Sequence, residues 1–239
     1  EQNLIPNNPA AEVDPPKFIG APMKVLTEAQ LDTFMAAIEK DEFWHDFFYT
    51  AVTTGLRRGE ICALRWEDFD AKQETLHVRR TLHKEKGKPL ITGDTKTYAG
   101  TRKIVLPPST AQLLRERKKT APTEWIFPNP FDPEQPIAPG TAYNRLKALL
   151  KETGLPDIRF HDLRHTFATH ALSSGVDAKT LAGILGHTKA SFTLDTYTHT
   201  TGDMQKRAAE IVGGFLTDYL GEEMNPWQSR ENMAAAPSV

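Results

Sequence analysis

The sequence predicts a mostly helical α+β domain that carries one small antiparallel sheet of about three strands. Two observations lead to this prediction. Apolar residues recur at helical spacing through most of the chain. In the middle of the chain, the pattern changes to short β-branched runs separated by glycines, which is typical of strands and turns. Lys and Arg are concentrated in the same part, so the sheet is expected to be basic.

The helices are predicted from apolar spacing and from signals at their ends. Thr27, followed three residues later by Gln30, has the spacing of a capping box and begins the first helix. A second helix ends at Gly55, and a third follows with Ile61 and Leu64 at helical spacing. From the second helix on, the predicted ranges are about 43–54, 111–119, 138–152, 161–173, 178–185 and 192–197, with an amphipathic piece over 204–220. The predicted strands are 75–82, 88–92 and 102–106, with Gly87, Gly93 and Gly100 between them.

The two ends of the chain differ in composition from the part between them. Residues 1–22 are rich in Pro, Asn and Ala, which predicts a linker that follows an N-terminal domain missing from the chain. We expect one folded domain over 23–221. Residues 222–239 contain Ala-Ala-Ala-Pro-Ser and predict a flexible tail.

The overall composition is that of an ordinary soluble globular protein, with 25% charged and 39% hydrophobic residues. No apolar run approaches the roughly 20 residues of a membrane helix, and the first ten residues lack the features of a secretory signal. The single cysteine, Cys62, excludes an internal disulfide and a cysteine-rich zinc site, and it fits a reducing cytoplasm.

Charge is distributed unevenly along the chain. The net charge of −2 argues by itself against nucleic-acid binding. Residues 71–120, however, hold 13 Lys and Arg against four Asp and Glu, a local net charge of +9. A concentrated basic stretch is what a polyanion-binding face requires, because phosphate contacts are local. A solvated basic surface explains the charge equally well.

The first candidate site segment is Thr-Gly-Leu-Arg-Arg-Gly-Glu, which contains Arg57 and Glu60. Arg57 follows a glycine turn at the start of a helix, and Glu60 lies one turn further on. This spacing puts the carboxylate beside the guanidinium, where it can hold one rotamer. The helix N-terminus adds partial positive charge for an anion. Taken alone, such a segment is more often a capped helix with a surface ion pair.

The second segment is His-Asp-Leu-Arg-His, in which His161, Arg164 and His165 share one helix face. The His-x-x-x-His spacing is also that of zinc ligands. An arginine on the same face argues against a cation and for a phosphate.

In the third segment, Leu-Gly-His is followed ten residues later by a tyrosine, which places His187 and Tyr197 in one neighbourhood. Each has an ordinary explanation in isolation: a histidine at a helix end and a half-buried core tyrosine.

Together and in this order, the three segments resemble the catalytic domain of the tyrosine recombinases, also called phage integrases. The resemblance covers residues from about 26 to 220 and is closest to integrases of conjugative transposons. It implies the tyrosine-recombinase catalytic fold, with an active-site lysine in a turn of the small sheet. Thr-Lys-Thr at 95–97 matches that turn, so Lys96 is the candidate and Lys103 a second choice. The Pro-rich start resembles the linker after the family's N-terminal core-binding domain.

The resemblance also implies a role for each site residue. Arg57 and Arg164 clamp the phosphate, His187 donates a further hydrogen bond, and Tyr197 attacks to form a 3′-phosphotyrosine. His161 is the candidate proton acceptor, Lys96 is the general acid for the 5′-oxygen, and Glu60 orients Arg57. The candidate phosphate contacts in the basic segment are Arg79, Arg80, Lys84, Lys86, Lys88, Arg102 and Lys103.

The expected activity is site-specific cleavage and exchange of DNA strands during integration and excision of a mobile element. It needs neither a metal nor a cofactor. The expected partners are double-stranded DNA (element ends and target site), further copies of the chain in a tetramer, and accessory DNA-bending proteins. No membrane is expected, and the location is the bacterial cytoplasm, with the nucleoid when bound.

Three alternatives remain open at this point. A type IB topoisomerase would use a similar site to relax DNA without exchanging strands. A DNA-binding module without catalytic activity would use 178–197 as a helix-turn-helix. A zinc hydrolase would use His161 and His165 and would require stoichiometric metal.

Overall fold

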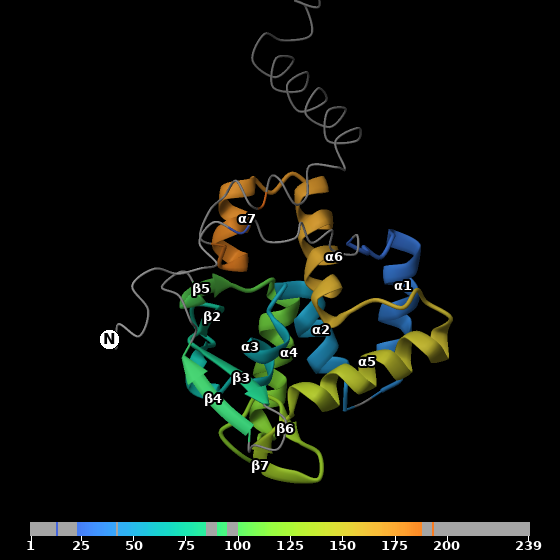
Figure 1. The fold of residues 1–239 in the computed structure, drawn as a ribbon. Coiled ribbons are helices and arrows are strands. Elements are labelled where there is room, and N and C mark those ends of the chain that lie inside the picture. Colours follow the sequence, from blue (N-terminus) through green and yellow to red (C-terminus); the bar gives the residue numbers. More distant parts are fainter. Residues whose placement is uncertain are drawn as a thin grey trace, which may run out of the picture.

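The computed structural model describes residues 13, 23–41, 43–84, 90–94, 100–187 and 193. Helices dominate this part of the chain, and short antiparallel strand pairs accompany them, as the sequence predicted (Figure 1). The elements are α1 (Glu28–Ile38), α2 (His45–Thr54), α3 (Arg58–Cys62), the 3-10 turn η1 (Trp66–Asp68), β1 (Phe69–Asp70), β2 (Thr75–Val78), β3 (Arg80–Lys84), β4 (Leu90–Asp94), β5 (Arg102–Val105), α4 (Pro108–Lys119), β6 (Pro128–Asn129), β7 (Asp132–Pro136), α5 (Pro139–Thr153), α6 (Phe160–Ser173) and α7 (Ala178–Leu185).

Helix α2 forms the centre of the core. Its Phe47 and Phe48 are fully buried and meet Phe127 and Phe160 in edge-to-face and tilted ring contacts. Helices α1, α3, α4 and α6 pack around it. A smaller apolar cluster, which includes Ala168, joins α6 to α7. The core therefore fixes α2 and α6 against each other, and α7 follows α6.

Several predicted helix ends are confirmed. The capping box of Thr27 and Gln30 is formed in both directions, at 3.3 and 3.0 Å. Helix α2 ends at Gly55, which has a left-handed φ of 62°. A Cβ at Gly55 would come within 2.4 Å of a ring carbon of Phe167, so both the turn and the close approach of α6 require glycine.

The prediction of one sheet was wrong in detail, because the structure has two sheets in the basic region. Among the described strands, β2 pairs with β1 and β5, whereas β3 pairs with β4. The predicted strand over 75–82 breaks at Arg79. Neighbouring side chains of a regular strand point to opposite faces, yet Arg79 and Arg80 both reach Asp68, at 3.5 and 2.9 Å. The chain therefore leaves one sheet at Arg79 and enters the other.

The hairpin of β6 and β7 was missed by the sequence prediction. Its register pairs Pro128 with Pro136. Proline has no N–H to donate to a neighbouring strand, so its presence argues against a strand in a sequence. A pair of edge strands can nevertheless contain proline.

Figure 1 shows α6 and α7 at one end of the described part, with α7 next to β5, and the β6–β7 pair at the opposite end. The predicted helix over 192–197 and the amphipathic piece over 204–220 lie outside the described residues, apart from Thr193. Within the described part, no helix is long and apolar enough to cross a membrane.

Candidate active site

The turn between α2 and α3 positions Arg57. Arg57 caps α3, and its backbone N–H donates to Glu60 Oε2 at 2.9 Å while its Nη1 donates to Glu60 Oε1 at 2.6 Å. Only 2% of the Glu60 side chain is exposed, against 37% for Arg57. Burial alone would raise the pKa of Glu60, but hydrogen bonds and charge from Arg102 and Arg57 hold it below its usual value. Glu60 is therefore an anion that fixes Arg57 and leaves part of its guanidinium open to solvent.

Helix α6 positions Arg164 deep in the same region. The side chain is 1% exposed, and its fork spans two separate segments. Nη1 donates to the Gly55 carbonyl at 3.0 Å, and Nη2 donates to the Leu185 carbonyl at 2.6 Å. A buried cation is tolerated only with such partners. Arg164 thereby ties the glycine turn after α2 to the end of α7.

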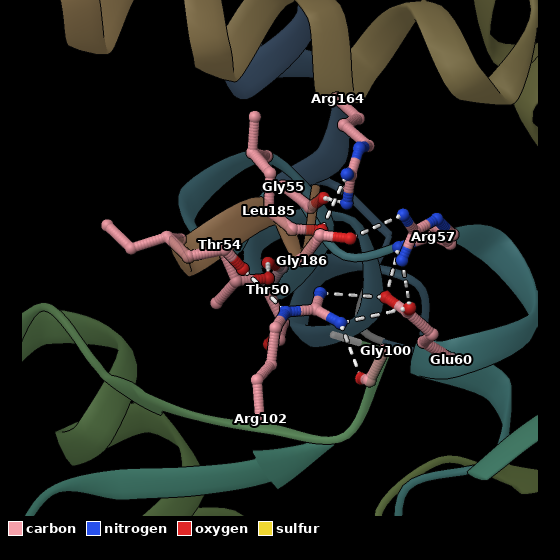
Figure 2. A network of polar contacts seen from close by, with 11 residues as sticks. Thr50, Thr54, Gly55, Arg57, Glu60, Gly100, Arg102, Arg164, Leu185 and Gly186 are labelled. Carbon is pink, nitrogen blue, oxygen red and sulfur yellow. Dashed lines mark hydrogen bonds and ion pairs between the residues drawn. The ribbon is translucent and has the colours of Figure 1, made fainter. Parts of the chain in front are cut away.

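The end of α7 is where the three sequence segments meet. Gly186, with a left-handed φ of 68°, ends the helix. Its carbonyl accepts a hydrogen bond from Arg57 Nη2 at 3.2 Å, next to the Leu185 carbonyl that accepts from Arg164. Figure 2 shows the two guanidiniums converging on these neighbouring carbonyls. Two arginines more than 100 residues apart in sequence are thus brought side by side.

His187 follows this helix end directly. Its Nδ1 lies 2.8 Å from the Thr193 hydroxyl, and its backbone N–H donates to the Ala182 carbonyl at 3.0 Å. Desolvation, followed by the charges of Arg164 and Arg57, lowers the pKa of His187 to about 4. The ring is therefore neutral at pH 7 and can donate one hydrogen bond without carrying charge.

His161 begins α6, one turn before Arg164. Its ring packs edge-on against His165, with centroids 4.6 Å apart. Partial desolvation and the cations Arg164 and Arg57 lower the pKa of His161, and desolvation with the neighbouring His161 lowers that of His165 to about 4. A neutral His161 is able to accept a proton. Among the described residues, no third His, Cys, Asp or Glu joins this pair to form a group that could hold a metal.

Several predicted site residues lie outside the described part of the chain: Lys96, Tyr197, Lys86 and Lys88. Of the other predicted phosphate contacts, Lys84 and Lys103 are exposed and Arg79 is 46% exposed. Arg80, at 15% exposed, forms ion pairs with Asp68 and Glu67. The exposed members keep the position that a phosphate contact requires, whereas Arg80 is already neutralised by acids.

Arg102 lies differently from the expectation of a phosphate contact. Its side chain is 7% exposed, and its fork holds both oxygens of Glu60, at 3.0 and 2.9 Å. The reason was available in the alternation of the strand: Arg102 and the core residue Ile104 fall on one face of β5, and Lys103 falls on the other. A net count of positive charge does not distinguish inward from outward arginines, and the structure places Arg102 among the inward ones.

Comparison with known proteins shows the family to which the chain belongs. Residues 24–203 match the family model described as "Phage integrase family". A "Tyrosine recombinase XerC-like" protein of Caldanaerobacter subterraneus is 30% identical over 188 residues, which cover 69% of this chain and 48% of that protein. The "ICEBs1 integrase" of Bacillus subtilis is 27% identical over 90% of this chain and 61% of its own length.

Solved structures agree with the sequence relatives. The Tn1549 transposon integrase, in a complex with transposon right end DNA, superposes with a TM-score of 0.71 at 25% identity, over 82% of this chain and 68% of that one. The fold and the relatives are thus those of proteins named as tyrosine recombinases and integrases. The chain belongs to the phage integrase family. It spans about half the length of the curated relatives that it matches.

Proposed function

We propose that this chain is the catalytic domain of a site-specific DNA recombinase that cuts and rejoins DNA through a 3′-phosphotyrosine at Tyr197. The observation that carries the proposal is the pairing of Arg57 and Arg164 on adjacent carbonyls beside the neutral His187. Phosphoryl transfer is catalysed mainly by positioned groups that stabilise the charge on the nonbridging oxygens. Two fixed guanidiniums and one imidazole N–H supply such groups.

Cleavage and rejoining need no external energy source, because one phosphoester bond replaces another. The Tyr197 phenolic oxygen attacks the scissile phosphorus, a P–O bond to tyrosine forms, and the bond to the 5′-oxygen breaks. A phenol has a pKa of about 10, so it needs a proton acceptor at neutral pH. His161 takes that proton, and Lys96 gives one to the leaving 5′-oxygen. A 5′-hydroxyl from another strand then reverses the step, and this reversal exchanges strands.

The roles of Lys96 and Tyr197 rest on the sequence pattern, and that of His161 rests on the sequence and on its lowered pKa. The substrate is double-stranded DNA at the ends of a mobile element and at its target. The name of the Bacillus subtilis relative and the DNA in the Tn1549 complex support this assignment. We further propose action as a tetramer, helped by accessory DNA-bending proteins, in the bacterial cytoplasm and on the nucleoid.

The test traps the covalent intermediate. The full-length protein is incubated in EDTA with nicked duplexes that tile the DNA flanking its gene, because the nick releases a short strand and prevents religation. On a denaturing gel, we expect a DNA-shifted protein band for the parent and for the control Tyr143→Phe, which removes the hydroxyl of a tyrosine on α5, but none for Tyr197→Phe. A protein that binds these duplexes without forming the band contradicts the proposal and favours a DNA-binding module. Relaxation of supercoiled plasmid without recombinant product would favour a type IB topoisomerase.

A further inference from the structure

Three consecutive carbonyls at the end of α7 each accept a hydrogen bond from a different arginine. The three arginines come from the start of α3, from β5 and from α6. The pairs are Arg102 Nε with Ile184 O at 2.6 Å, Arg164 Nη2 with Leu185 O at 2.6 Å, and Arg57 Nη2 with Gly186 O at 3.2 Å. The end of one short helix therefore organises all three guanidiniums.

The end of α7 can accept hydrogen bonds from arginines because the last carbonyls of a helix have no partner within the helix. The backbone N–H groups of Gly186 and His187 satisfy the Gly183 and Ala182 carbonyls, at 3.2 and 3.0 Å. The carbonyls that follow face the arginines instead. They carry the partial negative charge of a helix C-terminus, which stabilises cations.

Each nitrogen of the Arg102 guanidinium has a partner within the protein. Its Nη1 and Nη2 hold both Glu60 oxygens, Nη1 also donates to the Gly100 carbonyl at 3.1 Å, and Nε is held by the Ile184 carbonyl. Figure 2 shows the Arg102 guanidinium beside the Glu60 carboxylate, with Arg57 above that carboxylate and Arg164 further up. The fork is therefore committed to the protein itself.

This geometry determines how Arg57 is presented. Glu60 is 2% exposed, and a buried carboxylate needs both of its oxygens satisfied. Because Arg102 satisfies both from one side, Glu60 takes only Nη1 and the backbone N–H of Arg57. Nη2 of Arg57 therefore donates to the Gly186 carbonyl, while Arg164 donates to the adjacent Leu185 carbonyl. Two guanidiniums around one carboxylate also leave a net positive charge for a phosphate.

We propose that Arg102 is a positioning residue of this site: through Glu60 and the Ile184 carbonyl, it fixes Arg57 and the end of α7 in the geometry that clamps the scissile phosphate. The inference rests on the proposed function for its catalytic consequence. Arg102 itself does not touch DNA in this assignment, which replaces the phosphate contact expected from its charge.

The test compares Arg102→Lys and Arg102→Gln with a matched control, Arg117→Gln. Arg117 makes the same kind of clasp elsewhere, with Nε on the Ile126 carbonyl at 2.8 Å and Nη1 on Asp46 at 2.9 Å, and it is 18% exposed. Lysine at 102 keeps the charge but cannot span Glu60 and the Ile184 carbonyl together. Arg102→Lys therefore tests the geometry of the guanidinium fork while the positive charge is kept, and Arg117→Gln shows the effect of losing a similar structural arginine.

The first readout is the single-turnover rate of covalent complex formation by the full-length protein at saturating nicked duplex. For both Arg102 variants we expect a rate about 10- to 100-fold lower, which is the usual loss when a residue that orients a catalytic group is removed. DNA affinity should stay within about twofold of the parent. Arg117→Gln should keep the parental rate per folded molecule. Combining Arg102→Gln with Glu60→Gln should cost little more than either change alone, because both act through one ion pair. A parental rate in Arg102→Lys, or additive losses in the double variant, would overturn the proposal.

The second readout does not depend on activity. The order parameter of the Arg57 Nε–Hε group, measured by NMR relaxation, should fall in Arg102→Gln and remain unchanged in Arg117→Gln. If the parent forms no covalent complex, the proposed function fails, but this measurement still decides whether Arg102 positions Arg57. An Arg57 side chain that is equally ordered in the parent and in Arg102→Gln would refute the positioning role.

Discussion

Arg57 and Arg164 donate to neighbouring peptide carbonyls, Gly186 O at 3.2 Å and Leu185 O at 2.6 Å. Arg164 also holds the Gly55 carbonyl at 3.0 Å, only two residues before Arg57. Neighbouring backbone carbonyls therefore anchor both guanidiniums, and the Glu60 side chain holds Arg57 in addition. Such fixed spacing is what preorganised stabilisation of a phosphorane requires, because the donors need no rearrangement during the reaction.

Arg164→Lys tests whether charge or the guanidinium fork matters at this position. Lysine keeps the positive charge but cannot bridge Gly55 and Leu185, so the clamp loses its geometry. We expect the cleavage rate on the nicked duplex to fall by about 10²- to 10³-fold. Stability should fall by about 1–3 kcal/mol, because a buried carbonyl loses its partner. Urea unfolding and single-turnover cleavage measure the two effects, and cleavage within tenfold of the parent would argue against a clamp.

Gly55→Ala tests the close approach between the α2 turn and α6. Gly154 provides a matched control, since both glycines end a helix with a left-handed φ, 62° and 67°. A Cβ at Gly55 meets Phe167 at 2.4 Å, whereas nothing lies within 4 Å at Gly154. Both alanines cost about 1 kcal/mol of backbone strain, and Gly55→Ala should cost about 1–3 kcal/mol more through overpacking. Equal urea midpoints for the two variants would contradict this.

The sequence predicted the helical framework well because its signals are local. The capping box at Thr27 and the glycine end at Gly55 both require only neighbouring residues. The switch between two sheets at Arg79 was missed because it depends on Asp68, 11 residues away in sequence. A periodicity of two describes one strand and does not indicate which partner each half pairs with.

The sequence predicted the residue types of the candidate site and the pairing of Arg57 with Glu60, but not the rest of the geometry. Arg57 and Arg164 were named from their motifs, but no motif indicates that consecutive α7 carbonyls hold them. Arg102 was predicted as a phosphate contact from its charge, without regard to the face of its strand. A buried arginine is rare enough that composition favours exposure, and the contacts with Glu60 and the Ile184 carbonyl, which explain its burial, cannot be read from composition.

Acid should destabilise the protein through His165 and His187. Desolvation lowers the pKa of each to about 4, whereas an unfolded histidine titrates at about pH 6.5. Between these values the unfolded state binds more protons than the native state, so the free energy of unfolding decreases as the pH falls from about 6.5 to about 4. His165→Gln should flatten this decrease in urea unfolding curves recorded at several pH values. A variant whose stability falls as steeply as that of the parent in this window would indicate that His165 does not remain neutral.

We expect Arg79 to contribute to DNA binding and the adjacent Arg80 to contribute to stability. Arg79 is 46% exposed and lies 3.5 Å from Asp68, whereas Arg80 is 15% exposed and bridges Asp68 and Glu67. Because Arg79 is nearly half exposed and its pair with Asp68 is long, its guanidinium can contact a phosphate and release a counterion, so Arg79→Ala should reduce the salt slope of binding by about 0.9.

Arg80→Ala should leave that slope nearly unchanged, because its charge is already balanced by two carboxylates. It should instead cost about 1–3 kcal/mol of stability, since it removes a partner of Asp68. Asp68 is 2% exposed, and burial already raises its pKa. Fluorescence anisotropy across a salt series and urea unfolding separate the two effects. Equal slope losses for both variants would mean that the ion pairs of Arg80 open on DNA and that its charge reaches the phosphates after all.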